Sequence, residues 1–161
     1  MSDVLTWSAG LPELVFADED EIIVEGQPHD EILVLVHGAV RISKDGALIS
    51  VIDEPGALLG EVSVLLGRPA TASVIAVGDC VLRRFAQASV QIRHEPELLH
   101  AVATALAARL DLLTLYLADL VHQYGDSDSH LALVSQVLSS LSGHAGDAVE
   151  PGSEREPDAP Y

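Results

Sequence analysis

Several kinds of residue are scarce in this 161-residue sequence, and each scarcity excludes a class of protein. The single cysteine, Cys80, rules out an intramolecular disulfide framework, a four-cysteine iron–sulfur cluster and a cysteine-rich zinc site. We expect Cys80 to be a small buried apolar group. Aromatic residues make up only 4% of the chain while hydrophobic residues reach 48%, so leucine, valine, isoleucine and alanine must form most of the core.

Basic residues are also scarce. Eight lysines and arginines stand against 25 acidic residues, which gives a formal net charge of −17, and Lys44 is the single lysine. A protein that neutralises nucleic-acid phosphates needs clustered lysine and arginine. The charge therefore predicts that neither nucleic acid nor an anionic membrane is a partner.

Targeting and membrane signals are missing from the pattern. The start, Met-Ser-Asp, lacks the basic and apolar segments of a signal peptide. The longest apolar region, Leu98 to Ala118, is interrupted by His100, Arg109 and Asp111, so no membrane span is expected. The sequence predicts a soluble cytoplasmic protein.

Residues that carry catalysis or bind metals show no recognisable arrangement. None of the seven histidines lies three to five residues from another, the spacing of paired metal ligands. Serine, histidine and aspartate are scattered without a nucleophile elbow. We predict no metal site, no catalytic residue and no enzyme.

Residues 21–93 have the pattern of short strands separated by glycine-containing turns. Asp45-Gly46 is the strongest hairpin signal, because both positions tolerate positive φ. Many short strands at this spacing indicate a sandwich or jelly-roll barrel. The predicted strands are Glu21–Val24, Glu31–Val36, Ala39–Ser43, Ala47–Ile52, Ala72–Val77 and Val81–Phe85.

A long helix is predicted from Pro96, because proline suits a first helical turn and Leu98 to Tyr124 contains neither glycine nor proline. Leucines in this helix recur in steps of four and three residues, the spacing of a heptad seam. The seam favours a parallel homodimer, with a single helix packed on its own barrel as the alternative. Its members are Leu106, Leu110, Leu113, Leu117 and Leu120.

The pattern predicts three segments. Residues 1–124 form one domain that includes the long helix. Residues 125–142 form a short linker and an amphipathic helix at Leu131–Leu141. Residues 143–161 are rich in glycine, proline, serine and acidic residues, so an acidic disordered tail is expected.

The stretch from Gly60 to Val74 has the pattern of a phosphate-binding cassette. Gly60-Glu61 opens a one-turn apolar helix, a Gly67-x-Pro69 turn follows, and a strand of small residues comes next. Such a helix start attracts anions, because its backbone N–H groups lack partners within the helix.

Together with the glycine turns, this cassette resembles the sensor domain of the cyclic-AMP receptor and fumarate–nitrate regulator family, and cyclic-nucleotide-binding domains generally. The resemblance covers about residues 11–124. It implies an α+β fold: a small antiparallel β-roll (jelly-roll barrel) with a phosphate-binding-cassette helix and a long C-terminal dimerisation helix. The residues that carry it are Glu25-Gly26, Gly38, Asp45-Gly46, Pro55-Gly56, Gly60-Glu61, Gly67-x-Pro69 and the helix start at His94-Glu95-Pro96-Glu97-Leu98.

The resemblance also implies a ligand site for cyclic AMP or cyclic GMP, with no other cofactor. Glu61 would accept the ribose 2′-hydroxyl, backbone amides from Gly60 to Val62 would hold the phosphate, and Thr71 lies where the family offers serine or threonine. The expected set is Gly60, Glu61, Val62, Ser63, Arg68, Ala70, Thr71 and Ala72.

Ala70 departs from the family pattern, because the phosphate-binding arginine belongs at that position. Losing a charged hydrogen bond costs about 1.5–3 kcal/mol. Arg68 is the nearest substitute, but Pro69 stiffens the turn between them. Without the arginine, Glu61 would lie near the phosphate with little to offset the repulsion.

Two functions follow as hypotheses. The first is a stand-alone cyclic-nucleotide sensor that acts through a protein partner, because the chain ends before any recognition helix of a DNA-binding domain. The second is a dimeric interaction or scaffold protein whose pocket has lost the ligand. Ala70 favours the second, whereas Gly60-Glu61 and Thr71 favour the first.

Overall fold

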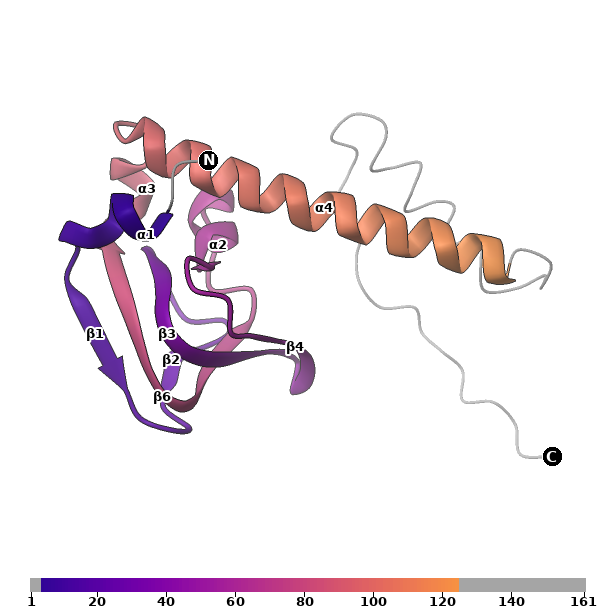
Figure 1. The fold of residues 1–161 in the computed structure, drawn as a ribbon, viewed down its shortest axis with the longest axis horizontal. Helices are drawn as coiled ribbons and strands as arrows, with labels where there is room; N and C mark the ends of the chain where they lie inside the picture. Colours follow the sequence, from indigo (N-terminus) through magenta and orange to yellow (C-terminus); the bar gives the residue numbers. More distant parts are fainter. Residues whose placement is uncertain (1–3, 125–161) are drawn as a thin grey trace. The chain divides into compact units, whose positions relative to one another are not determined.

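The computed structural model describes residues 4–124, which form six strands and several helices (Figure 1). The chain divides into two units between Arg109 and Leu110. The first unit holds the strands, and the described part of the second is the remainder of the last helix. The elements are α1 (Val4–Trp7), the 3₁₀ turn η1 (Ser8–Gly10), β1 (Glu13–Phe16), β2 (Glu21–Ile23), β3 (Glu31–Lys44), β4 (Ala47–Ile52), β5 (Leu58–Leu59), α2 (Glu61–Leu66), β6 (Ser73–Ala86), α3 (Ala88–Gln91) and α4 (Pro96–Tyr124).

The strands form one antiparallel sheet in the order β1-β6-β3-β4, while β2 pairs with β6 and β5 with β3. The β-roll with a cassette helix and a long C-terminal helix is therefore confirmed. β4 has the predicted bounds, and its turn residues Asp45 and Gly46 both have positive φ, 50° and 77°. The cassette helix and the start of the long helix at Pro96 also match.

Four predicted strands are in fact two, and this is the main error of the sequence prediction. β3 and β6 each run for 14 residues through glycines at which the sequence pattern predicts turns. Gly38 and Gly78 have positive φ, 88° and 67°, and the β3–β6 register shifts around His37. The glycines bend the strands inside the ladder, as bulges do, so hydrogen bonding continues beyond them. The short elements β1, β5, α1, η1 and α3 were not predicted.

The central strand β3 is apolar on both faces, because each face covers a separate core. Leu33 and Leu35 belong to the cluster inside the roll, whereas Ile32 and Val34 belong to the cluster under the helices. The inner cluster includes Cys80, which is fully buried as expected, and burial raises the pKa of its thiol, with Asp20 and Asp79 adding to the effect. The helix-side cluster contains Val64, Phe85, Ala88, Ile92, Leu98 and Val102.

The bend at Gly38 gives a first prediction. A Cβ at this position would lie 2.5 Å from the Asp79 carbonyl oxygen, whereas a Cβ at Gly46 would meet nothing within 4 Å. Both positions have positive φ, which costs an L-residue about 1–2 kcal/mol. Gly38→Ala adds overpacking of about 1–3 kcal/mol. Urea unfolding is expected to show a clearly larger loss for Gly38→Ala than for Gly46→Ala, and equal losses would contradict the packing argument.

Candidate functional site

The cassette helix α2 starts at a glycine that another residue could replace only with strain. Gly60 has φ 87°, and a Cβ there would lie 2.5 Å from His29 Nε2 and 2.6 Å from the Glu31 carbonyl oxygen. The helix ends at Gly67 with φ 62°, and the Ser63 hydroxyl donates to the Gly60 carbonyl at 2.9 Å. The first amides of α2 have no partner within the helix, so its start keeps donors for a ligand.

Glu61, the first residue of α2, is buried, with 2% of its side chain exposed, and its carboxylate accepts a hydrogen bond from Arg109 on α4. The same guanidinium donates to the Leu58 carbonyl oxygen at 2.8 Å. A carboxylate removed from water must be paired, because an unpaired buried charge is strongly destabilising. Arg109 thus neutralises the charge that was expected to repel a phosphate, which corrects that part of the sequence interpretation.

Arg109 is the site residue that sequence reasoning missed. It appeared there only as a polar interruption of an apolar helix. The sequence does offer a sign of its role, since Arg109 is the only basic residue between Leu98 and Tyr124 apart from histidine. The need for the pair comes from Glu61, which is the buried carboxylate of the described residues and requires a cation.

Ala70 lies in the inner core with 4% of its surface exposed. Its backbone is fixed on both sides, because the Ala70 N–H donates to the Gln27 carbonyl at 2.9 Å and its own carbonyl accepts from the Gly26 N–H at 2.8 Å. The methyl group is therefore a core contact, at the position where the family carries a charge. Thr71 and Ala72, the next two residues, are half-buried.

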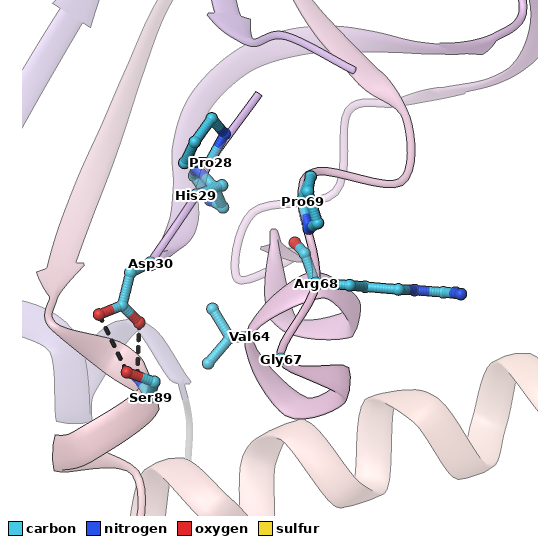
Figure 2. A pocket seen from close by; sticks show the side chains of 9 residues that line it. Pro28, His29, Asp30, Val64, Gly67, Arg68, Pro69 and Ser89 are labelled. Carbon is cyan, nitrogen blue, oxygen red and sulfur yellow. Dashed lines mark hydrogen bonds between the residues drawn. The ribbon is translucent and has the colours of Figure 1, made fainter. Parts of the chain in front are cut away.

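Arg68 does not lie with Glu61. It is exposed, and Figure 2 shows its side chain extended away from the other residues of a pocket of about 470 Å³ on the α3-facing side of α2. This pocket includes Ser63 but neither Glu61 nor the 70–72 segment. It is lined by Pro28, His29, Asp30, Ser63, Val64, Gly67, Arg68, Pro69 and Ser89. The expected ligand set is thus divided between two sides of α2.

The β3–β4 hairpin is tied to the strand that leaves the cassette. Lys44 Nζ donates to the Thr71 carbonyl oxygen at 3.0 Å and to Glu25 Oε1 at 3.3 Å. Glu25 Oε2 accepts from the Asp45 N–H at 2.9 Å. The Asp45 N–H, with a smaller contribution from Lys44, lowers the pKa of Glu25 below its ordinary value.

Only part of the predicted dimer seam is exposed and free to contact a second helix. Leu106 packs against the helix-side core, whereas Leu110 and Leu113 are 47% and 48% exposed. Leu117 is half-buried, and the side chain of Leu120 lies outside the described part of the structure. The segment Leu131–Leu141 and the tail also lie outside the described residues. Whether the seam forms a dimer stays a prediction.

By length and composition alone, Pro96–Asp119 could cross a membrane, with a mean hydropathy of 1.5 and 11% of its window buried. The sequence expectation excluded such a span. Leu98 and Val102 in its first half are fully buried against the domain, and Arg109 pairs with Glu61. Packing in the domain therefore accounts for the apolar character of that half. Within residues 4–124, no group of three potential metal ligands occurs.

Residues 13–92 match the model of the cyclic nucleotide-binding domain family. They form a domain of this family. Among curated proteins, the cGMP-dependent protein kinase egl-4 of Caenorhabditis elegans is 36% identical over 61 residues, which are 38% of this chain and 8% of the kinase. The chain thus spans a small part of that relative.

Two solved structures have the same fold. The N-terminal domain of a transcriptional regulator from Streptomyces coelicolor A3(2) is 28% identical, with a TM-score of 0.51 over 69% of this chain and 84% of that one. The Thermus thermophilus catabolite activator protein is 22% identical, with a TM-score of 0.56 over 88% of this chain and 84% of that one. Both likenesses agree with the β-roll and the helix that follows it.

The Glu61–Arg109 pair can be tested by a double-mutant cycle. Arg109→Met leaves the buried carboxylate unpaired. Breaking a fully buried pair costs about 3–5 kcal/mol of stability, and the expected cost here is smaller because the Arg109 side chain is 45% exposed. Adding Glu61→Gln is expected to recover much of that loss. Urea unfolding measures each variant, with Arg93→Met at an exposed position as the control. Additive effects of the two changes would show that the pair contributes no coupling.

Glu25 provides a pH-dependent test. Its folded-state pKa is lowered, so its contribution to stability is present above the unfolded pKa and is lost as the pH falls through the folded value. Lys44→Met is expected to raise the Glu25 pKa only part of the way to its ordinary value, because the Asp45 N–H remains. A carboxyl NMR titration measures this. A full return would mean that Lys44 is the main cause.

Proposed function

We propose that this chain is a regulatory sensor module whose domain binds a cyclic nucleotide at the start of α2 and acts through a protein partner. One observation supports this most strongly: Glu61 is buried at the first position of α2 and is held there by Arg109. A domain retained only as a scaffold has no need for a buried ion pair, because replacing both partners of such a pair by well-packed apolar residues is often neutral or stabilising.

The same pair supplies a route for the signal. Arg109 bonds both to Glu61 and to the Leu58 carbonyl, and it lies on α4. A ligand hydroxyl that donates to Glu61 competes with Arg109 for the carboxylate oxygens. Binding would therefore change how the cassette holds α4, and a partner that contacts the later part of α4 would sense the change. The homodimer through the leucine seam is part of this proposal, because Leu110 and Leu113 stay exposed.

Affinity is expected to be low. A charged hydrogen bond to the phosphate contributes about 1.5–3 kcal/mol, and roughly 1.4 kcal/mol corresponds to a factor of ten in affinity. Ala70 therefore predicts binding about 10 to 150 times weaker than that of a domain with arginine at this position. The α2 amides and the neutralised Glu61 remain to bind either cyclic AMP or cyclic GMP.

The second hypothesis, a scaffold with a degenerate pocket, has one specific observation in its favour. Ala70 is a core residue whose methyl packs inside the roll, and the exposed Arg68 extends away from the pocket that it lines. On either hypothesis the role is regulatory and not catalytic, because the matched residues are those of a binding domain. A cytoplasmic location stays a prediction from the sequence.

Calorimetric titration with cyclic AMP and then cyclic GMP, up to millimolar concentration, tests the proposal. The wild-type chain is expected to bind one of them weakly, and Ala70→Arg is expected to increase the affinity about 10- to 150-fold by restoring the charged contact. Ala70→Met, of similar length without charge, controls for overpacking, and Arg68→Met is expected to change little. Urea unfolding confirms that each variant is folded.

Each outcome decides between the two hypotheses. Binding by the wild type that increases with Ala70→Arg supports the sensor. No heat from the wild type or from a folded Ala70→Arg variant at millimolar ligand would exclude nucleotide sensing and leave the scaffold. Loss of binding in Arg68→Met would show that this arginine moves to the phosphate after all.

A further inference from the structure

Strand β4 forms a free edge of the sheet. It pairs with β3 alone, at the end of the order β1-β6-β3-β4. No other backbone hydrogen bond reaches residues 47–52 within the part of the chain that the structure describes. A strand in this position presents a row of unpaired N–H and C=O groups, which is the template for adding another strand.

Its side chains do nothing to block such pairing. The strand reads Ala-Leu-Ile-Ser-Val-Ile, without charge or proline. Leu48, Ile49 and Val51 are 63%, 62% and 56% exposed. Edge strands are usually protected by lysine, proline or bulges. The one protective feature is a register shift beside Ile49, which leaves the stretch from Ser50 to Ile52 regular.

The turn that leads into this edge is tied to the rest of the domain by hydrogen bonds. Glu25 accepts from the Asp45 N–H in the hairpin turn, and Lys44 donates to Glu25 and to the Thr71 carbonyl. A hairpin whose turn is fixed loses less conformational entropy when a partner binds than one with a free turn does. The hairpin is therefore prepared to receive a strand.

We propose that β4 binds an extended segment of a protein partner as an added antiparallel strand, and that this segment is apolar with lysine or arginine at its ends. Charge selects this occupant. Exposed Asp45 precedes β4, and exposed Asp53 and Glu54 follow it. The one nearby lysine, Lys44, is already used by Glu25 and Thr71. Basic residues at both ends of the partner segment would complement these carboxylates.

A second copy of the chain fits less well. Antiparallel pairing of two β4 strands would bring Asp45 of each copy beside the Asp53–Glu54 end of the other. Like charges placed opposite one another destabilise strand pairs, and each chain already carries a net charge of −17. This inference goes beyond the proposed sensor function and does not depend on nucleotide binding.

The test uses the full chain and a fluorescent eight-residue peptide of alternating valine and threonine with lysine at each end. A matched peptide carries glutamate at each end. Fluorescence anisotropy is expected to show at least tenfold tighter binding of the lysine peptide at low salt, with the difference shrinking as salt rises. Equal affinities for the two peptides would overturn the charge argument.

Variants locate the site. Val51→Lys places a charge on β4 at an exposed position and is expected to weaken binding at least tenfold, with Leu48→Lys as a second variant in case one fails to fold. Val15→Lys is the control, because Val15 is 76% exposed on β1, the opposite edge of the sheet. Unchanged affinity in folded Val51→Lys and Leu48→Lys would exclude β4. A wild-type dimer that Val51→Lys converts to a monomer in sedimentation would show that a second copy occupies the edge instead.

Discussion

The burial of one carboxylate organises the cassette side of this domain. Glu61 lies at the point where the chain turns from β5 into α2, and it has almost no contact with water. A charge in that position requires a cation, and Arg109 can supply one only if α4 lies against the cassette. The fully buried Leu98 and Val102, earlier on the same helix, hold α4 in that position by apolar packing. Electrostatic need and hydrophobic packing thus fix the same helix.

The two long strands β3 and β6 form the curved sheet that supports the cassette. β3 and β6 pair over nearly their whole lengths. They stay continuous because Gly38 and Gly78 absorb the bend in conformations that other residues adopt only with strain. The sheet therefore curves while β3 and β6 stay paired on both sides of the bend. Ala70 and Cys80 belong to the core inside the roll.

The sequence was sufficient for features that depend on local chemistry. Asp45-Gly46 predicted a hairpin turn, Gly60 a helix start, and Pro96 the beginning of α4, because backbone conformation at those positions is nearly decided by the residue itself. It was insufficient where a residue serves a distant partner. Gly38 looks the same in a turn as in a bulge, since only the opposite strand distinguishes the two. The short strands β1 and β5 form because partners are already present.

The candidate site shows the same division. Gly60, Glu61 and Thr71 could be proposed as ligand residues from the motif alone. The separation of the expected ligand residues onto two sides of α2 could not be predicted, because it depends on the direction in which the Arg68 side chain leaves the turn. Arg109 is 48 residues from Glu61 in the chain. No local pattern connects two such residues, and only the burial of the carboxylate makes the connection necessary.

The contact between Arg109 and the Leu58 carbonyl also determines which partner of the ion pair must be the base. A guanidinium has donors enough for both the carboxylate and the carbonyl, whereas a carboxylate can only accept. If the two residues exchanged places along the chain, the charges would still match, yet the Leu58 oxygen would face another acceptor. The acid is therefore suited to the cassette and the base to the helix, and exchanging the two would leave the Leu58 oxygen without a donor.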